Sequence, residues 1–435
     1  MVLKGEGLAA AFTMDMLIPN TEIEFCACVH KVKKMGAFAF LILRTGRYLI
    51  QSVYEQGVCS GSLEGIYQGC YVKVKGMVKA EKRAMLGAEI RLADISLLSA
   101  PKEEYPLKVA DKKLGCSLEI NLQHRTVALR NPMERAVFQV AESVVTAFAQ
   151  FMRSQNFTRI HTPKIVTAGA EGGANIFKLK YFGKDAYLAQ SPQVYKQTCV
   201  AFFDRVFEIG AVYRAEKHNT PRHINEYIGL DYEMGYIDSM YDVMNLEVAL
   251  MDYMLKYIAD NYAYELDLLG ATLPILGAVP SITFDKAIDI VTKGKGSKKT
   301  DLDPIDEESL SKYALKEYNS DFIFVTHYPG AKRPFYAMDD PKDAKIALSF
   351  DLICRGLEIT TGGQRIHDYD SLVSKMLARG MHPDAFAPYL DIFKYGMPPH
   401  GGLGIGLERT VMKFLNLKNV RQASLFPRDL THLEP

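Results

Sequence analysis

The chain has 435 residues, of which 48% are hydrophobic, 24% charged and 11% aromatic, which suggests two or three domains at about 150 residues each. Its 52 basic and 51 acidic residues leave a net charge of +1, which excludes a polybasic membrane anchor but not a local nucleic-acid-binding surface. No apolar run reaches the ~18 residues of a membrane-spanning helix, and Asp15 interrupts the only apolar stretch near the start. We therefore expect a cytoplasmic protein with no membrane partner, and seven reduced cysteines.

Residues 20–100 are predicted to form a small β domain. They contain runs rich in β-branched and aromatic residues, such as TEIEFCACVHKV and CYVKVKGMVKA, separated by breaks that contain glycine. Several short strands at this spacing favour a small barrel, for which the five-stranded oligonucleotide-binding (OB) fold is one candidate. We place this domain at 1–100 and a hinge at 101–133, where PKEEYPLKVADKK is charged and interrupted by proline.

A second domain is predicted from residue 134 to the end. Apolar residues at helical spacing from Val137 to Met152 predict an amphipathic helix. Strand-like and helical segments then mix without a βαβ rhythm, which favours an α+β domain on an antiparallel sheet over a doubly wound fold. The most polar stretch of the chain, 293–309, predicts a surface loop within an insertion near 270–320.

The first cluster of chemically active residues follows a strand-like run at 205–209. It predicts two strands joined by a long polar loop that carries Arg214, Lys217, Arg222 and two histidines. Guanidinium groups suit phosphate oxygens, so the loop is typical of a phosphate-binding site. The alternative is a charged hairpin tip in solvent.

The second cluster combines a carboxylate, a hydroxyl three residues later and an arginine around two glycines. Glu358 could hold Mg²⁺, Thr361 supplies the hydroxyl, and Arg365 could bind an anion beside Gly362 and Gly363. The alternative is an ordinary Gly-Gly turn.

The third cluster, HGGLGIGLER at 400–409, predicts a glycine-rich strand that leads into a helix. A flat ligand could lie against such a backbone, with Arg409 in the first helical turn. The segment is neither a phosphate loop, because no Gly-Lys-Ser/Thr follows, nor a dinucleotide fingerprint, because the βαβ context is missing.

A fourth run, QSPQVYK at 190–196, predicts the start of a helix. Gln193 and Lys196 lie about one turn apart on one helix face and could present donors to a small anion. The alternative is a purely structural helix start, with Ser191 as its cap and Pro192 in its first turn.

Together these segments resemble the aspartyl-tRNA synthetases of the archaeal and eukaryotic type, a family within class IIb of the aminoacyl-tRNA synthetases. The three signatures of that class are similar to FTRIHTPKIV with Pro163, YRAEKHNTPRHINEYIGLDYEM and GGLGIGLERTVMKFL. The amino-acid-binding segments of the family look like AEGGANIFKLKYFGKDAYLAQSPQVYKQ and GLEITTGGQRIHDYD. The resemblance extends over nearly the whole chain.

The resemblance implies an N-terminal anticodon-binding OB barrel and a catalytic domain on an antiparallel six-stranded sheet. It also implies a homodimer formed through the segment around Pro163. The implied activity is ATP-dependent activation of aspartate, with Mg²⁺ as cofactor, and transfer to the 3′-terminal adenosine of tRNA(Asp).

The resemblance also assigns roles in the site. Arg214 would hold the α-phosphate and the substrate carboxylate, and Tyr227 and Arg409 would sandwich the adenine. Arg214 and Arg409 would be the catalytic residues. The aspartate-binding residues would be Glu171, Gln193, Lys196, Arg214, Asp231, Thr361 and Arg365. The ATP-binding residues would be Arg214, Glu216, Arg222, His223, Ile224, Tyr227, Glu358, Gly406 and Arg409, and the Mg²⁺ ligands Glu358 and Thr361, the latter a serine in most of the family.

Selection of aspartate over asparagine is expected to depend on charge, because the two are nearly isosteric. Lys196 and Arg365 would face a neutral amide without an anionic partner, which costs several kcal/mol. This disfavours asparaginyl-tRNA synthetase as the alternative. An amide-forming paralogue lacks the barrel, and a catalytically inactive RNA-binding paralogue is disfavoured because Arg214, Glu358 and Arg365 are present.

In the barrel, the resemblance places Phe40 and Gln51 where anticodon bases are stacked and hydrogen-bonded, although Phe40 could equally be a core residue. His30 occurs where members that also charge tRNA(Asn) carry histidine, whereas the loop with Arg83 lacks the proline that those members favour. Use of tRNA(Asn) therefore stays open. If it occurs, a tRNA-dependent amidotransferase is an implied partner.

Overall fold

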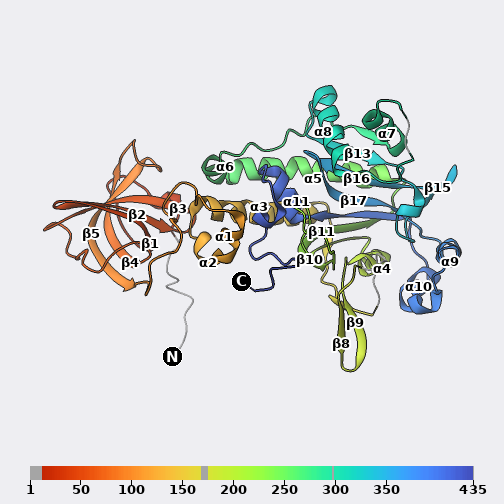
Figure 1. The fold of residues 1–435 in the computed structure, drawn as a ribbon, viewed down its shortest axis with the longest axis horizontal. Coiled ribbons are helices and arrows are strands. Elements are labelled where there is room, and N and C mark those ends of the chain that lie inside the picture. Colours follow the sequence, from red (N-terminus) through yellow and green to blue (C-terminus); the bar gives the residue numbers. More distant parts are fainter. Residues whose placement is uncertain (1–11, 168–174, 296–297, 435) are drawn as a thin grey trace. The chain divides into compact units, whose positions relative to one another are not determined.

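The computed structural model describes residues 12–167, 175–295 and 298–434 of the chain (Figure 1). The chain divides into two compact units, Met1–Pro132 and Met133–Pro435. Each unit has a hydrophobic core of its own, as an independently packed domain requires. Within the described ranges, none of the helices has the length and apolar character needed to span a bilayer.

The N-terminal unit contains a closed barrel of five strands in the order β1-β2-β3-β5-β4, which confirms the predicted OB-type barrel. Its strands are β1 (Glu22–Met35), β2 (Phe38–Thr45), β3 (Tyr48–Glu55), β4 (Tyr71–Ala80) and β5 (Ala88–Ser99). Neighbouring strands pair antiparallel, except for β3 and β5, which pair in parallel. Side chains alternate across each strand, so Val72 and Val74 of β4 are buried while Lys73 between them is exposed.

The segment predicted as a hinge contains two short helices, α1 (Leu118–Gln123) and α2 (Arg125–Ala128). Ser117 caps α1, because its hydroxyl accepts a hydrogen bond from the backbone N–H of Ile120 at 3.3 Å. Leu107, Val109 and Ala128 form a small apolar cluster nearby. The segment is packed locally, and its role as a hinge stays a prediction.

The C-terminal unit is built on an eight-stranded sheet in the order β12-β13-β16-β17-β18-β11-β10-β6. The six central strands pair antiparallel, as the resemblance implies. They are β13 (Phe322–Thr326), β16 (Ser349–Cys354), β17 (Leu357–Arg365), β18 (His400–Gly406), β11 (Glu226–Gly235) and β10 (Arg205–Tyr213). Short edge strands, β12 (Ser281–Thr283) and β6 (Thr158–Arg159), add one parallel pairing at each end.

Helices α3 (Pro132–Ser154) and α5 (Met240–Asn261) pack against one face of this sheet, and α3 confirms the predicted amphipathic helix. The alternation of β11 separates the two faces of the sheet. Leu230 and Tyr232 belong to the core beneath these helices, whereas Asp231 and Glu233 lie on the opposite side of the strand. One face of the sheet is therefore the core, and the other is free to carry a polar site.

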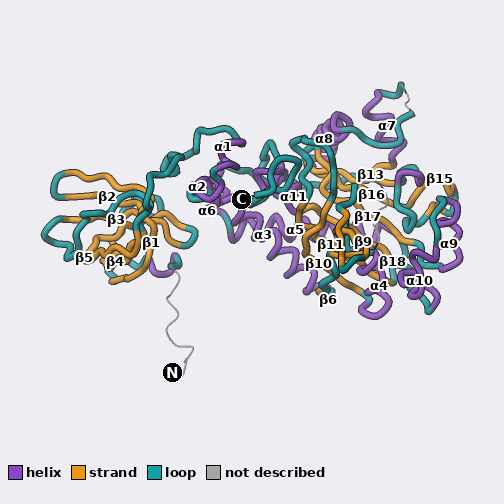
Figure 2. Tube along the Cα trace, turned by 60° about the horizontal axis from the view of Figure 1, so that its bottom comes forward, coloured by secondary structure: helices purple, strands orange, loops and turns teal. Residues whose placement is uncertain are grey.

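Shorter elements surround the sheet (Figure 2). The remaining helices are α4 (Gln193–Phe203), α6 (Ala263–Leu269), α7 (Phe284–Thr292), α8 (Pro304–Tyr318), α9 (Tyr369–Ala378), α10 (Ala387–Lys394) and α11 (Leu407–Phe414). Two small sheets add β7 (Ile165–Val166), β9 (Lys184–Leu188) and β8 (Lys178–Tyr181), and the pair β14 (Asp339–Asp340) and β15 (Asp343–Ala347). Helices α7 and α8 pack beside β13 (Figure 1).

Helix α8 corrects the prediction of a surface loop over residues 293–309. The helix begins at Pro304, within that stretch. Asp303 caps it by accepting hydrogen bonds from the backbone N–H groups of Ile305 and Asp306, and proline is favourable in the first turn. The high polarity of these residues reflects the cap and first turn of a helix as much as exposure to solvent.

Candidate active site

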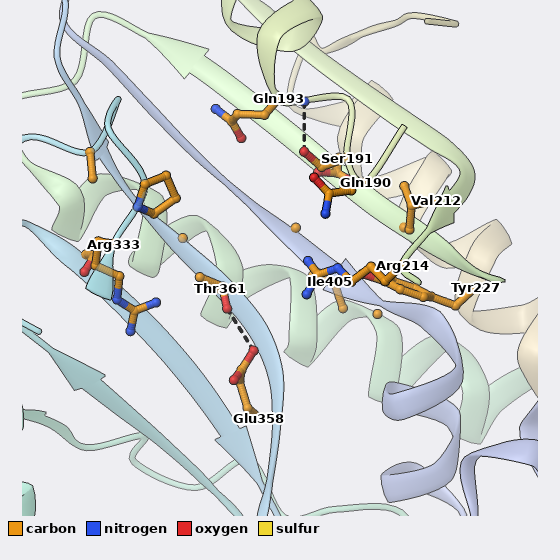
Figure 3. Close-up of a pocket in the computed structure, with 18 of the residues that line it drawn as sticks. Gln190, Ser191, Gln193, Val212, Arg214, Tyr227, Arg333, Glu358, Thr361 and Ile405 are labelled. Atoms are coloured by element: carbon orange, nitrogen blue, oxygen red, sulfur yellow. Dashed lines mark hydrogen bonds between the residues drawn. The ribbon is translucent and has the colours of Figure 1, made fainter. Parts of the chain in front are cut away.

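A cavity of about 700 Å³ opens on the face of the sheet opposite α3 and α5 (Figure 3). Its walls come from β11, β17, β18, the starts of α4 and α11, and the loop after β10. Except for Glu171, which lies outside the described residues, every residue to which the resemblance gives a role in binding aspartate, ATP or Mg²⁺ lines this one cavity. These residues are Gln193, Lys196, Arg214, Glu216, Arg222, His223, Ile224, Tyr227, Asp231, Glu358, Thr361, Arg365, Gly406 and Arg409.

Two buried cations lie at one end of the cavity, each against a carboxylate. The Lys196 ammonium, on α4, donates hydrogen bonds to Asp231 at 2.9 Å and to the carbonyl of Leu403 at 2.8 Å. The Arg365 guanidinium, at the end of β17, donates to Glu233 at 2.9 Å and to the carbonyl of Gly402 at 2.9 Å. Lys196 is only 2% exposed, so this end of the cavity is fixed by charge-assisted contacts before any ligand arrives. We call this group, Lys196 and Arg365 with Asp231 and Glu233, the acid-reading end.

Glu233 is a central residue of the acid-reading end that we did not single out from the sequence. Its carboxylate is fully buried and lies 3.4 Å from the Lys196 ammonium as well as against Arg365. Burial alone would raise the pKa of Glu233, but Arg365 and Lys196 outweigh it and hold the pKa below its ordinary value. The period of two along β11 was the signal that could have found it, since Glu233 shares a face with Asp231.

The pKa of Asp231 is shifted in the opposite direction to that of Glu233. Burial raises the pKa of Asp231 even though Lys196 opposes the shift. A cationic ligand group at this carboxylate would therefore relieve an unfavourable charge. Glycines leave space for one, because a Cβ at Gly404 would lie 3.0 Å from the Asp231 carboxylate.

The paired glycines of the second cluster are not a turn, because Gly362 and Gly363 lie within β17. A Cβ at Gly362 would lie 2.4 Å from the ring of Phe350, and one at Gly363 would lie 2.7 Å from the carbonyl of Leu348. A Cβ at Gly402 of β18 would lie 2.2 Å from the Glu233 carboxylate. Glycine is therefore required by close packing of the strands under the site.

The middle of the cavity presents aromatic and cationic faces. The Arg214 guanidinium lies 5.8 Å from the centre of the Tyr227 ring, a cation–π distance (Figure 3). Arg409 lies in the first turn of α11, as predicted, and donates to the backbone carbonyl of Glu358 at 3.2 Å. Both guanidinium groups and the Tyr227 ring therefore line the same cavity.

The polar loop between β10 and β11 is held by the C-terminal segment of the chain. Buried Arg421 pairs with Asp429 and donates to the Asn219 side chain at 2.7 Å and to the Thr220 carbonyl at 3.0 Å. Thr220 in turn bonds the ring of His223 at 2.6 Å. Burial lowers the pKa of His223, while Glu216 at 3.6 Å opposes the shift. The two ends of the loop, with Arg214, Glu216, Arg222 and His223, thus form part of the cavity wall, whereas residues 217–219 are exposed to solvent.

A carboxylate and a hydroxyl are in contact at the other end of the cavity, which we call the phosphate end. The Thr361 hydroxyl donates to Glu358 at 2.8 Å (Figure 3), and Asp351 of the neighbouring strand is paired in register with Thr361. Burial, and then the charge of Asp351, raise the pKa of Glu358. Oxygen donors and clustered negative charge fit a hard divalent cation such as Mg²⁺. Among the described residues, no group of three or more His, Cys, Asp or Glu could hold a metal by itself, so phosphate oxygens and water would complete the shell.

Asp351, Glu307 and Glu408 are further carboxylates of this region that we did not single out from the sequence. Asp351 forms a bidentate pair with Arg333, at 2.9 and 2.6 Å. Glu408 accepts a hydrogen bond from the backbone N–H of Ile228, next to Tyr227, at 3.1 Å, and burial raises its pKa to about 7. Burial, and then the charge of Glu358, raise the pKa of Glu307 to about 7 against the opposing effect of Arg222. All three act across strands or between elements, which no linear motif records.

The barrel residues predicted to meet the anticodon differ in their exposure and contacts. Phe40 is 39% exposed on β2, which rules out its alternative as a core residue. The Gln51 side chain donates to Glu89 at 2.8 Å, and exposed Arg83 pairs with Glu81 at 3.2 Å. His30 is buried on β1, which argues against direct contact between its side chain and a base.

Comparison with known families matches residues 117–430 to the family model "tRNA synthetases class II (D, K and N)". The chain is 44% identical to the aspartate–tRNA(Asp/Asn) ligase of Deinococcus radiodurans, over 97% of this chain and 98% of that protein. It is 42% identical to the aspartate–tRNA(Asp/Asn) ligase of Thermus thermophilus, over 95% and 97%. It is 37% identical to the aspartate–tRNA(Asp) ligase of Pyrococcus horikoshii, over 95% and 96%.

Solved structures give the same fold over the full length. The asparaginyl-tRNA synthetase of Pyrococcus horikoshii complexed with asparaginyl-adenylate superposes with a TM-score of 0.88 at 30% identity, covering 98% of this chain and 100% of that one. A putative aspartyl-tRNA synthetase from Leishmania major superposes with a TM-score of 0.86 at 29% identity, covering 100% and 97%.

Proposed function

The chain belongs to the class II tRNA synthetases of the aspartate, lysine and asparagine group, and from this premise we propose that it activates aspartate with ATP and transfers it to the 3′-terminal adenosine of tRNA(Asp). The single observation that carries the choice of amino acid is the acid-reading end of the cavity. There, Lys196 and Arg365 are buried beside Asp231 and Glu233. Two cations at one end of the cavity favour an anionic side chain over the neutral side chain of asparagine.

The charges at the acid-reading end match aspartate when they are counted one by one. The α-ammonium of the amino acid would pair with Asp231, whose pKa is raised and whose carboxylate lies beside Gly229 and Gly404. Glu233 then offsets one of the two cations and leaves one positive charge for the side-chain carboxylate. Asparagine would leave that charge buried without a partner, at a cost of several kcal/mol.

The activation step needs no general base. The α-carboxylate of aspartate is ionised at pH 7 and attacks the α-phosphorus of ATP. The new C–O–P bond forms as the bond between the α-phosphorus and the bridging oxygen breaks, and pyrophosphate leaves with that electron pair. Arg214, within the cavity beside Tyr227, would neutralise the α-phosphate, while Tyr227 and Arg409 hold the adenine. The ribose hydroxyl of the tRNA then displaces AMP from the adenylate.

Mg²⁺ is the cofactor that the phosphate end fits. Glu358 and Thr361 would bind it, with Asp351 close behind in the adjacent strand. When bound, it supplies charge neutralisation at the phosphates.

The direct test is pyrophosphate exchange with each amino acid in turn. Exchange that depends on aspartate and not on asparagine is the expected result. Exchange with asparagine alone would show that the chain is an asparaginyl enzyme, and no exchange with any amino acid would show an inactive RNA-binding paralogue.

We extend the proposal to tRNA(Asn) as a second acceptor. The relatives whose names include both tRNAs have the higher identities among those compared above. His30 is also the residue that the resemblance associates with members that charge both tRNAs. Purified tRNA(Asp) and tRNA(Asn) offered side by side should both be charged with aspartate. The mischarged aspartyl-tRNA(Asn) would then need a tRNA-dependent amidotransferase as partner. Charging of tRNA(Asp) alone would restrict the proposal to one acceptor.

We also propose that the barrel binds the anticodon and that the chain forms a homodimer. Exposed Phe40 offers a stacking face, worth ~1–3 kcal/mol per base. For the dimer, Ile165 close to Pro163 is exposed, and Phe182 at the tip of the β8–β9 hairpin is 90% exposed. Phe40→Ala should weaken tRNA charging and leave exchange unchanged. Phe182→Asp should lower the molar mass measured by light scattering.

A further inference from the structure

We propose that Glu307 is a positioning residue for the nucleotide, which holds the Arg222 guanidinium ready for the distal phosphates of ATP and for pyrophosphate. This rests on the proposed function, because it requires ATP in the cavity. Glu307 lies in the first turn of α8, outside every segment that carries the resemblance. Nothing in the linear motifs points to it.

The geometry of Arg222 carries the proposal. One guanidinium nitrogen donates to the Glu307 carboxylate at 2.6 Å, and the other terminal nitrogen donates to the carbonyl of Gly356 at 2.9 Å. A planar guanidinium held at both terminal nitrogens cannot rotate, and its remaining N–H groups stay available to a ligand. A loop arginine is thereby fixed before the nucleotide binds.

Arg222 and Glu307 differ in their position relative to the cavity. Arg222 lines the cavity, whereas Glu307 is not among the residues that form its wall. Glu307 therefore contacts Arg222 from the side away from the ligand, and it is only 12% exposed. Its place in the first turn of α8 offsets part of the cost of burying a carboxylate, because the N–H groups of that turn carry partial positive charge, but burial still raises the pKa of Glu307 to about 7.

Neighbouring cations make the carboxylate necessary. Arg222 and Glu307 both act electrostatically on Lys413, and Arg409 acts on Glu307. The Arg409 side chain also approaches the backbone carbonyl of Arg222 at 3.4 Å. Above its raised pKa of about 7, Glu307 is ionised and offsets the repulsion of these cations on Arg222, so that removal of its charge leaves the Gly356 carbonyl as the remaining partner of the guanidinium. A hydrogen bond to a charged group is commonly worth enough to change an affinity by roughly tenfold or more.

The experiment compares Glu307→Gln with Glu308→Gln in pyrophosphate exchange. Glu308 is the next residue of the same helix, its side chain is 63% exposed, and it pairs only with Lys312 in the structure described. For Glu307→Gln we expect KM for ATP, and KM for pyrophosphate in the reverse reaction, to rise about tenfold while KM for aspartate stays the same. Glu308→Gln should match the parent. Arg222→Gln should raise the same two constants, and the double variant should be no worse than Arg222→Gln alone.

Each outcome decides the matter. Unchanged KM for ATP and pyrophosphate in Glu307→Gln, with both raised in Arg222→Gln, would overturn the role of Glu307 and leave the proposed function intact. Equal rises in KM for aspartate and ATP would show a general structural role and would also overturn it. Should Glu307→Gln fail to fold, Glu307→Asp, which withdraws the carboxylate by one methylene, replaces it. Absence of aspartate-dependent exchange in the parent would instead refute the proposed function.

Discussion

The two ends of the cavity use charge in opposite ways. At the acid-reading end, Lys196 and Arg365 face Asp231 and Glu233, two cations against two carboxylates in direct contact. At the phosphate end, Glu358 has its nearest cation, Arg409, at 3.8 Å, and both burial and Asp351 raise its pKa. The first end is complete before a ligand arrives, as selection between two similar side chains requires. The second end carries negative charge that its neighbours compensate only in part, and a divalent cation would suit it.

Removing a cation from the acid-reading end should have the largest effect. Arg365→Leu leaves Glu233 with only part of its compensation, and breaking a buried pair costs about 3–5 kcal/mol. We expect aspartate-dependent pyrophosphate exchange to fall by at least ~100-fold while ATP binding, measured by calorimetry, is retained. Arg153→Leu, at an exposed position of α3, is the control. Exchange at the parental rate in Arg365→Leu would refute the assignment of this end.

A buried acid behind the phosphate end should make stability depend on pH. Glu247 of α5 is fully buried, and burial raises its pKa from 4.5 to about 8. Because the folded state holds this proton more tightly, its contribution to stability is present below pH 4.5 and is lost as pH rises through about 8. Glu247→Gln lacks this titration, so its free energy of unfolding relative to the parent should rise by up to about 5 kcal/mol between pH 4 and pH 9.

Urea unfolding of the parent and Glu247→Gln at both pH values measures this difference. Asp252→Asn changes an exposed acid of the same helix that pairs with Lys256, and its difference from the parent should be constant over that range. Parallel pH profiles for Glu247→Gln and the parent would show that Glu247 is ionised in the folded protein.

The middle of the cavity should respond less strongly than the acid-reading end. Tyr227→Ala removes the ring that we propose to stack on adenine, and such stacking is worth ~1–3 kcal/mol, so KM for ATP should rise about tenfold. Tyr227→Phe keeps the ring and should stay close to the parent. If both variants raise KM for ATP equally, the hydroxyl and not the ring is what matters.

The smallest effect is expected at Thr361. Thr361→Ser keeps the hydroxyl that donates to Glu358 at 2.8 Å, so exchange should stay within about twofold of the parent. Thr361→Val removes the oxygen and should raise the Mg²⁺ concentration needed for half-maximal exchange. A serine variant that needs as much additional Mg²⁺ as the valine variant would show that the size of the side chain, and not its hydroxyl, sets the Mg²⁺ requirement.

Most of the fold and the residues around the cavity could be predicted because they lie in continuous segments. The strand pair around the loop of Arg214 and the strand before Arg409 both followed from local patterns. The edge strands β6 and β12 are two and three residues long and left no pattern. The alternative of a turn at Gly362 and Gly363 was wrong. The ring of Phe350, which leaves no space for a side chain at Gly362, lies on another strand and could not be inferred from the local sequence.

The missed residues share a physical cause. Glu307 contacts Arg222 across 85 positions of sequence, and Glu233 contacts Arg365 across 132. Such pairs exist only once the sheet and α8 have formed, so no spacing reveals them. Phe40 was ambiguous for another reason, since Leu41 beside it is also apolar and either could have pointed into the barrel.

The glycines in the strands under the cavity limit how the enzyme could be adapted to other amino acids. Gly362, Gly402 and Gly404 bring the main chain so close to its neighbours that even one added carbon at the first two would collide. Protein engineers commonly enlarge or reshape a pocket by trimming its lining side chains, but here there is nothing at these positions to trim. A redesigned variant that accepts a bulkier or uncharged monomer would have to exchange Lys196, Arg365 and their acidic partners as one set.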